Sequence, residues 1–504
     1  MLALSLLMAA VSLAFALPAR AQAPPSPSTA PAKGPIVAPS GAGDAWSADE
    51  IAALQRDLDA MLAAAPALRG AHAGVLVTDT RTGATLYARN ADDEFQPAST
   101  FKLIVGSAAL EKLGEDYRFR TTASLARLGN LPGVARSGVL RGALLVRGGG
   151  DPFLSVRDLD NLALAIAQAG IKRILGPILV DESRYDRTPY APGWTWDDFT
   201  YDYAAPASAL AVEENVAHVH VAPARLLGRP ARFSVAPPVV HVSSSVVTLA
   251  PGSITTADVD PDPRGRLHLS GGIALGAASH AIDAAVADPQ AYARKVLIWR
   301  LRAHGVQVAP APRSRGTLAL RETRRVWKHL SAPLSELLPR FWIPSDNLVG
   351  EMWLKELGFV STGSAGSTLK GIAYEKHWLQ SLGIDLTTLT LADGCGMSQY
   401  DRVTPRALVA ILQHDWNAPY REIVLSALPV GGARGTIEGI AGTPAAGRVF
   451  AKTGSMRHVR GLAGYLSPRR HGAVTFAFSI DDWNGNFADL AALRAQVLSR
   501  IVTD

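Results

Sequence analysis

Patterns typical of β-strands gather at the two ends of this chain and are scarce in the residues next to them. Residues 74–80 and 84–89 are rich in β-forming residues and are joined by a turn at 81–83. Three more such runs lie near the other end, at 448–451, 459–466 and 473–480. Amphipathic helical patterns over 51–62, opened by a capping-box pattern at Ser47 and Glu50, and over 486–502 flank the two groups. We therefore predict one antiparallel sheet, built from both ends of the chain and accompanied by both terminal helices.

The chain is too long for one compact core, since it has 504 residues. Between 122 and 325 the pattern is mostly of short strand-like runs separated by Gly and Pro, with helical stretches at 158–169 and 289–303. We predict that 122–325 forms two inserted mixed or β-rich domains, the second nested at about 190–270. Residues 44–121 and 326–504 would then make one domain, helical again over 330–415.

The first residues predict export. An apolar run at 2–17 ends in small residues before position 21, which is typical of a signal peptide over 1–21. A Pro- and Ala-rich tether follows over 22–43. We expect secretion to the periplasm or cell envelope. The single cysteine, Cys395, excludes an internal disulfide framework, so packing must stabilise the fold.

The net charge of +6 is spread along the sequence. No block of Lys and Arg with interleaved aromatic residues is present, so we expect no nucleic-acid partner. A basic surface favours an anionic polymer or a membrane face, which indicates peripheral association with the membrane or the wall.

Ser99-Thr100-Phe101-Lys102 is the first candidate for chemistry. An apolar helical run follows, so Ser99 and Lys102 would lie one turn apart on one face, with Ser99 at the helix N-terminus. A desolvated neutral Lys can activate a serine nucleophile. Alone, this pair is better explained as a helix cap with an ordinary surface lysine.

Two further motifs favour the catalytic interpretation of Ser99 and Lys102 over the helix cap. Ser345-Asp346-Asn347 opens a helix, where Ser345 could relay a proton and Asn347 could orient the substrate and Lys102, although all three are also good N-cap residues. Lys452-Thr453-Gly454-Ser455 ends a strand-like run and suits an edge strand that receives an extended peptide, although Thr-Gly is also common in turns. Ser-x-x-Lys, Ser-Asp-Asn and Lys-Thr-Gly in this order are a known signature of β-lactamases and penicillin-binding proteins.

The spacing of these motifs resembles the class C low-molecular-mass penicillin-binding proteins, the D-alanyl-D-alanine carboxypeptidase/endopeptidase family. The resemblance also covers 149–152, 205–210, 329–334, 393–398 and 435–436. It implies an α/β (α+β) transpeptidase core of the penicillin-binding and β-lactamase type, with an antiparallel five-stranded sheet, a helical lobe and large inserted domains.

The resemblance also implies a mechanism without metal or cofactor. Ser99 would attack D-Ala-D-Ala peptides of peptidoglycan, with Lys102 as the base and Ser345, Asn347 and Lys452 as further catalytic residues. The expected substrate-binding residues are Asp346, Thr453, Gly454 and Ser455, with the backbone N–H groups of Ser99 and Ser455 as the oxyanion hole. β-Lactam antibiotics would acylate Ser99 as covalent inhibitors.

Three departures from the family pattern bear on substrate preference: Cys395 in place of Ser, Gln399 in place of a common Arg, and Phe341-Trp342-Ile343-Pro344 before Ser345. Asp181, Tyr185 and Asp186 are candidate contacts for a diamino-acid side chain of the stem peptide. Two alternatives stay open beside a carboxypeptidase with or without endopeptidase activity: a β-lactamase, and a non-catalytic wall-binding protein of the same fold.

Overall fold

A computed structural model describes residues 35–129, 137–262, 264–310, 319–437 and 439–504. The predicted signal peptide (1–21) and most of the predicted tether (22–43) lie outside these ranges. Among the helices that the structure describes, none has the length and apolar character needed to cross a membrane.

The two ends of the chain form one antiparallel five-stranded sheet, as the sequence predicts. The strand order is β18-β19-β20-β1-β2, so β1 from the start of the chain pairs with β20 from its end, with Val75 opposite Phe478. The strands are β1 His72–Asp79, β2 Thr85–Arg89, β18 Val449–Met456, β19 Val459–Leu466 and β20 Val474–Asp481. The expected strand at 448–451 is longer than predicted, because β18 stays paired with β19 through Met456.

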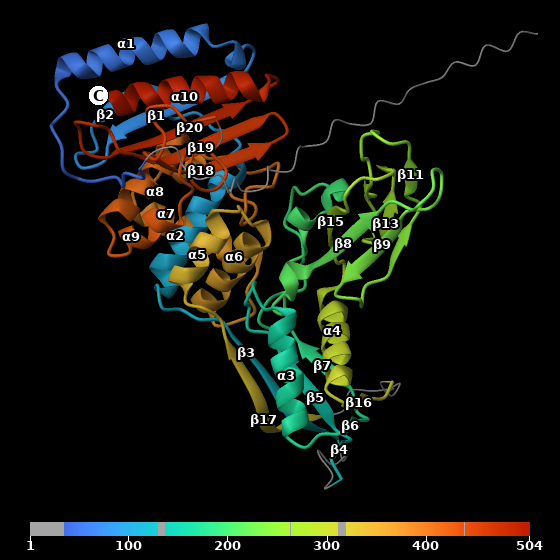
Figure 1. The fold of residues 1–504 in the computed structure, drawn as a ribbon. Helices are drawn as coiled ribbons and strands as arrows, with labels where there is room; N and C mark the ends of the chain where they lie inside the picture. Colours follow the sequence, from blue (N-terminus) through green and yellow to red (C-terminus); the bar gives the residue numbers. More distant parts are fainter. Residues whose placement is uncertain (1–34, 130–136, 263, 311–318, 438) are drawn as a thin grey trace, which may run out of the picture.

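Helices cover both faces of this sheet (Figure 1). The terminal helices α1 (Ala48–Ala64) and α10 (Phe487–Thr503) pack side by side on one face. Ser47 begins α1 with the predicted capping box, and Leu54, Leu58 and Leu62 turn its apolar side toward the sheet. On the other face α8 (Pro405–Asn417) contacts β20, β1 and β19.

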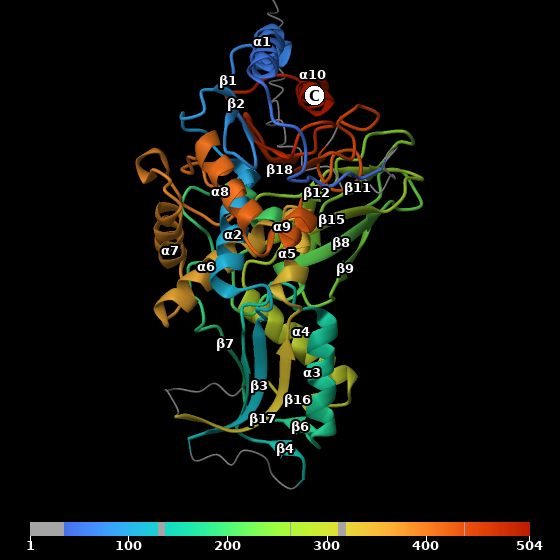
Figure 2. The same ribbon diagram turned by 90° about the vertical axis from the view of Figure 1, so that its left-hand side faces the viewer.

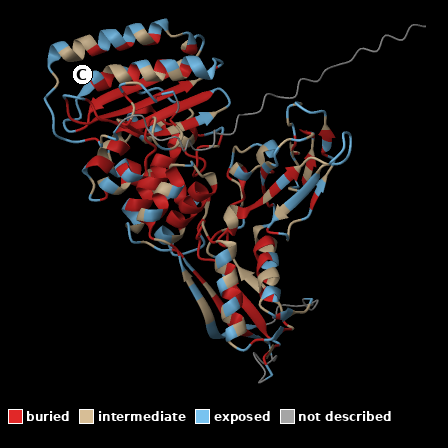
Figure 3. Ribbon diagram, viewed as in Figure 1, coloured by how far each residue is buried: buried red, intermediate tan, exposed pale blue. Residues whose placement is uncertain are grey.

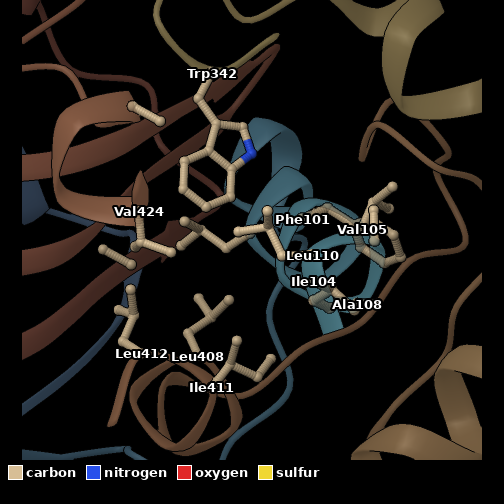
Figure 4. Close-up of a cluster of buried hydrophobic side chains, with 14 of the residues drawn as sticks. Phe101, Ile104, Val105, Ala108, Leu110, Trp342, Leu408, Ile411, Leu412 and Val424 are labelled. Atoms are coloured by element: carbon tan, nitrogen blue, oxygen red, sulfur yellow. The ribbon is translucent and has the colours of Figure 1, made fainter. Parts of the chain in front are cut away.

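A helical lobe extends from that second face. Its helices are α2 Lys102–Leu113, α5 Leu334–Trp342, α6 Asn347–Thr362, α7 Thr368–Ser381, α8 and α9 Arg421–Ala427, with 3₁₀ turns at η2 Ala98–Phe101 and η6 Leu386–Thr388. The 3₁₀ turn η1 Pro66–Leu68 lies instead between α1 and β1 and contacts α10. Figure 4 shows Phe101, the last residue of η2, and Ile104 of α2 in one cluster with Trp342 and Leu408. Because α2 is buried along most of its length, its first residue Lys102 is fixed deep inside the protein.

The middle of the chain leaves the lobe through β3 (Arg120–Leu128) and returns through β17 (Leu320–Leu330), and these long strands pair with each other (Figure 2). They belong to the sheet β17-β3-β5-β7, with α3 and α4 alongside and the small sheet β16-β6-β4 at the far end. The bounds are β4 Val139–Leu140, β5 Ala143–Arg147, α3 Val156–Gln168, β6 Arg173–Ile174, β7 Ile178–Asp181, α4 Pro289–Ala303 and β16 Gln307–Val308.

A second, β-rich part follows β7 and contains three small sheets, ordered β15-β8-β9, β10-β13-β12 and β11-β14. The elements are η3 Trp196–Asp198, η4 Asp202–Ala204, η5 Glu213–Asn215, β8 Val216–Ala222, β9 Arg232–Ala236, β10 Val242–Ser244, β11 Val247–Leu249, β12 Asp258–Val259, β13 Leu267–Ser270, β14 Gly272–Ala274 and β15 His280–Ala285. One hydrophobic cluster joins both parts of the insertion. The exact domain boundaries stay a prediction, since the paired strands β3 and β17 run across positions 122 and 325.

Candidate active site

Ser99 and Lys102 lie at the junction of η2 and α2. Ser99 lies in the 3₁₀ turn η2, whereas the sequence predicts it at the N-terminus of an α-helix. The α-helix α2 begins after this turn, at Lys102. Lys102 Nζ donates a hydrogen bond to Ser99 Oγ at 2.7 Å. The turn is held closely from outside: a Cβ on Gly396 would lie 1.9 Å from the carbonyl oxygen of Ala98. The nucleophile candidate and its base therefore meet at hydrogen-bond distance on a tightly packed turn.

The ammonium position of Lys102 is enclosed by acceptors and shielded from water. Its side chain is fully buried, and Nζ also donates to Asn347 Oδ1 at 2.6 Å and to the carbonyl oxygen of Cys395 at 2.9 Å. Burial lowers the pKa of Lys102, although the nearby Asp393 and Asp346 oppose this shift. The lowered pKa increases the fraction of neutral amine, which is the form that can take a proton from a serine hydroxyl.

The Ser-Asp-Asn motif lies at the start of α6. Asp346 is the N-cap and accepts a hydrogen bond from Val349 N at 3.1 Å, as its residue type predicts. Asn347 is fixed at both ends of its amide, because Oδ1 accepts from Lys102 while Nδ2 donates to the carbonyl oxygen of Tyr203 at 2.8 Å. Ser345 adopts a left-handed backbone with φ of 69°.

Lys452 approaches the same site from the edge strand β18. Its Nζ donates to Ser345 Oγ at 2.8 Å and to its neighbour's carbonyl oxygen, that of Thr453, at 2.9 Å. The side chain is fully buried, and burial together with the charge of Lys102 lowers the pKa of Lys452 well below its usual value. Simultaneous protonation of Lys102 and Lys452 is therefore disfavoured, and Lys452 is held against Ser345 by its hydrogen bond.

The rest of the Lys-Thr-Gly motif forms one wall of the site. Thr453 Oγ1 lies 2.5 Å from Thr436 Oγ1, so the two hydroxyls share a hydrogen bond. A Cβ on Gly454 would lie 2.6 Å from the carbonyl oxygen of Pro97, so only glycine lets β18 pack against η2. Ser455, the next residue, is exposed. The motif lies on a strand, as the sequence predicts, but well inside β18 and not at its end, since β18 continues to Met456.

A buried loop at 393–398 binds Lys102 through the carbonyl oxygen of Cys395. Asp393 accepts four N–H groups: those of Cys395 (3.0 Å) and Gly396 (2.6 Å) on Oδ1, and of Ser398 (2.7 Å) and the Trp194 ring (3.0 Å) on Oδ2. These bonds set the direction of the Cys395 carbonyl group that holds Lys102. Asp393 thus fixes the loop on which the lysine rests.

The same loop holds the one grouping of possible metal ligands among the described residues. Glu351, Asp393 and Cys395 place one ligand atom each within 4.8 Å of one another. Both oxygens of Asp393 are already occupied by N–H donors, and burial raises the pKa of the Cys395 thiol well above its usual value. Burial and Asp393 likewise raise the pKa of Glu351 to about 8. All three groups take part in the hydrogen bonds that hold the loop, since Glu351 also accepts the N–H of Gly394 at 2.6 Å.

Comparison with known proteins agrees with this geometry. The profile of the D-Ala-D-Ala carboxypeptidase 3 (S13) family matches residues 54–499. The chain belongs to this family. It is 34% identical over 446 residues to a D-alanyl-D-alanine carboxypeptidase of Actinomadura sp. (strain R39), covering 84% of this chain and 80% of that protein. It is 26% identical over 443 residues to the D-alanyl-D-alanine carboxypeptidase DacB of Haemophilus influenzae, covering 85% and 89% of the two chains.

The fold of this S13 family member is similar to that of a solved relative. The crystal structure of penicillin binding protein 4 from Haemophilus influenzae superposes with a TM-score of 0.75 at 26% identity, covering 88% of this chain and 98% of that one. The predicted penicillin-binding fold and the predicted serine peptidase family are therefore confirmed.

Three candidate substrate contacts in the insertion are engaged elsewhere. Asp181 pairs with Arg147 at 2.8 Å, Tyr185 donates to Glu356 at 3.0 Å, and Asp186 pairs with Lys355 at 2.5 Å. The structure brings none of them to Ser99 through a direct contact. The bonds of Tyr185 and Asp186 attach this segment to α6, whereas the pair of Asp181 with Arg147 stays within the insertion.

The departures from the family pattern lie in different places. Phe341 and Trp342 are fully buried in the lobe, where the Trp342 ring donates to the carbonyl oxygen of Lys102 at 2.9 Å. Gln399 is exposed and receives hydrogen bonds from Gln96 on its backbone carbonyl group (3.0 Å) and on its side chain (3.2 Å). Cys395 is buried, with Sγ 3.5 Å from Asp393 Oδ2.

Sequence reasoning missed three contributors to the site. Two of them, Tyr203 and Cys395, act through backbone carbonyl groups, which leave no trace in the residue type. The third, Thr436, belongs to the Gly435-Thr436 pair that the family shares. The resemblance included this pair but did not predict the hydrogen bond of Thr436 to Thr453.

Proposed function

We propose that this member of the S13 family is a serine D-Ala-D-Ala carboxypeptidase with Ser99 as its nucleophile. The observation that carries the proposal is the hydrogen bond from the buried Lys102 to Ser99 Oγ. Lys102 in its neutral form takes the proton from Ser99 as Oγ attacks the carbonyl carbon of the penultimate D-Ala. The charge that develops on the carbonyl oxygen faces the backbone N–H groups of Ser99 and Ser455.

Departure of the terminal D-Ala needs a proton on its amine. Ser345 is suited to deliver it, because its hydroxyl accepts a hydrogen bond from Lys452 at 2.8 Å and can be resupplied with a proton by that lysine. Asn347 keeps Lys102 and the substrate aligned from the opposite side. Water then attacks the ester of Ser99 and gives a proton through Ser345 to Lys452, while Lys102 returns its proton to Ser99 Oγ. The shortened peptide leaves as its carboxylic acid, and the hydroxyl and both lysines are restored.

The proposal also includes a binding site for the terminal carboxylate of the substrate. Lys452 and the hydroxyl of Thr453 supply a cation and a donor on the same strand, and Asp346 supports the motif by capping α6. An extended peptide could pair with the edge of β18, with Gly454 leaving room beside the backbone. A β-lactam carries a carboxylate and a strained amide in the same relation, so it would acylate Ser99 and leave slowly.

The proposed setting is the cell envelope, where peptidoglycan is found. The predicted signal peptide over 1–21 supports export, and the wall peptides ending in D-Ala-D-Ala are the proposed partners. Peripheral association with the membrane or the wall is part of the same proposal. Endopeptidase action on cross-links would use the same acyl-enzyme, with a peptide amine in place of free D-Ala as the leaving group.

Covalent labelling tests the nucleophile. The purified protein should form an adduct with a fluorescent penicillin that survives denaturation, and Ser99→Ala should form none. Ser107→Ala is a matched control, since Ser107 lies further along α2 and bonds to Asp415, away from Lys102. Labelling of Ser99→Ala at the rate of the natural chain would refute the assignment.

The same experiment separates the alternatives. A β-lactamase would hydrolyse the penicillin fast and leave no lasting adduct. A non-catalytic wall-binding protein would bind a D-Ala-D-Ala peptide without releasing D-Ala. Mass spectrometry of products from purified peptidoglycan would show whether terminal D-Ala is removed, a cross-link is cut, or both.

A further inference from the structure

One end of the insertion lies opposite α1 and α10 (Figures 1 and 2), and the elements at this end are rich in arginine. We call this end the basic tip and define it by six exposed residues from β3, β6, β17 and the turn between β4 and β5: Arg127, Arg141, Arg173, Arg321, Arg324 and Arg325. Figure 3 shows that the strand carrying three of them, β17, is mostly exposed along its length.

Few acidic groups balance these charges. Within the described parts of 120–181 and 289–330, every Asp and Glu already has a basic partner: Asp151 and Asp158 with His329, Asp160 with Arg300, and Asp181 and Glu322 with Arg147. The six arginines of the basic tip form no ion pair with any described residue. The tip therefore presents uncompensated positive charge.

The strand register increases this charge locally. Arg321 stands directly opposite Arg127 in the β3–β17 ladder, and like charges in this position destabilise a sheet. β-Bulges between Glu322 and Arg324 and between Arg325 and Trp327 interrupt the same ladder. The fold thus tolerates a repulsive pair on an exposed surface, and an anion between the two guanidinium groups would relieve that repulsion.

The composition of the tip indicates which anion. Guanidinium groups bind phosphate through two parallel hydrogen bonds, and arginine is the main cation at this end, although the exposed Lys172 lies beside Arg173. Leu320, next to Arg321, is 42% exposed, so an apolar side chain stands among the cations. Phosphate above hydrocarbon is the chemistry of a phospholipid surface. The tip also lies far from the strand and helix that carry Lys452 and Lys102, so it does not belong to the peptide site (Figure 1).

We propose that the basic tip docks this protein on the anionic phospholipid surface of a membrane. Docking would hold the sheet and its active site away from the lipid, toward the wall. The inference rests on the proposed envelope location and not on the catalytic roles proposed for Ser99 and Lys102.

Vesicle co-sedimentation of the full mature chain tests the proposal. The protein should bind vesicles of phosphatidylcholine mixed with phosphatidylglycerol and not vesicles of phosphatidylcholine alone. A triple variant with Arg321→Gln, Arg324→Gln and Arg325→Gln should bind the anionic vesicles about a hundredfold more weakly, since each basic residue near an anionic surface contributes about fivefold.

A matched triple variant with Arg56→Gln, Arg69→Gln and Arg81→Gln removes the same charge from exposed positions in α1, after η1 and in the turn between β1 and β2, outside the insertion. It should lose less than fivefold. Equal losses in the two triples, or no binding by the natural chain, would overturn the proposal. Preference for a soluble polyanion such as dextran sulfate over the anionic vesicles would also overturn it. Both triples should keep penicillin labelling of Ser99, so failure of docking and failure of the proposed catalysis are distinguishable.

Discussion

Replacing Asn347 by Asp tests whether the neutral form of Lys102 drives acylation. The Asn347 oxygen lies 2.6 Å from Lys102 Nζ, and a unit charge there would attract the ammonium by about 6 kcal/mol at an effective dielectric constant of about 20. Much of this is offset by the cost of burying the new carboxylate. An opposite charge at such distances raises a lysine pKa by about 1 to 3 units.

The rate of acylation should rise with pH as Lys102 loses its proton. Asn347→Asp raises the pKa, so the rising limb should move by about 1 to 3 units to higher pH, and the rate at neutral pH should fall by about 10- to 1000-fold. The assay is the second-order rate of labelling by a fluorescent penicillin, measured from pH 5 to pH 11 in steps of about one unit.

Asn347→Ala is the matched control, because it removes the acceptor without adding charge. It should lower the rate without moving the limb to higher pH. If Asn347→Asp lowers the rate equally at every pH and its profile has the same midpoint as that of Asn347→Ala, the reasoning about Lys102 is wrong.

Three further outcomes follow from individual contacts. Thr436→Val should raise KM for a peptide with a free terminal carboxylate by about tenfold with little change in kcat, because Thr453 loses its hydroxyl partner, whereas Thr436→Ser should behave as the natural chain in steady-state assays. Gly106→Ala should lower the free energy of unfolding in urea by about 1 to 3 kcal/mol, since its Cβ would lie 2.4 Å from the buried Trp342 ring, and an unchanged midpoint would contradict this packing. Burial raises the pKa of Asp415 to about 8, so this carboxyl stabilises the fold at low pH and loses that contribution as pH rises toward 8. Between about pH 5 and pH 7, the free energy of unfolding of Asp415→Asn should therefore increase relative to that of the natural chain by about 1.4 kcal/mol per pH unit. Equal slopes of unfolding free energy against pH in the two proteins would contradict this.

Local patterns in the sequence determined the elements and the kinds of chemistry. The capping box at Ser47, the run of apolar residues after Lys102 and the N-cap Asp346 act over one or two helical turns, and each appears in the structure where the pattern predicts it. The strand runs at the two ends predicted the shared sheet because their number and terminal position left few other pairings. The end of β18 was misplaced, since pairing with β19 carries Lys452 through Ser455 into the strand.

Tertiary structure alone decided how the three motifs meet. The carbonyl groups of Cys395 and Tyr203 that fix Lys102 and Asn347 are the same in every residue, so no sequence pattern can reveal them. The same holds for the lowered pKa of Lys102 and Lys452, because burial arises from segments that are distant in the chain. The residue types of the site and the one-turn spacing of Ser99 and Lys102 are thus local information, while the burial of Lys102 and its contact with Asn347 are properties of the packed fold.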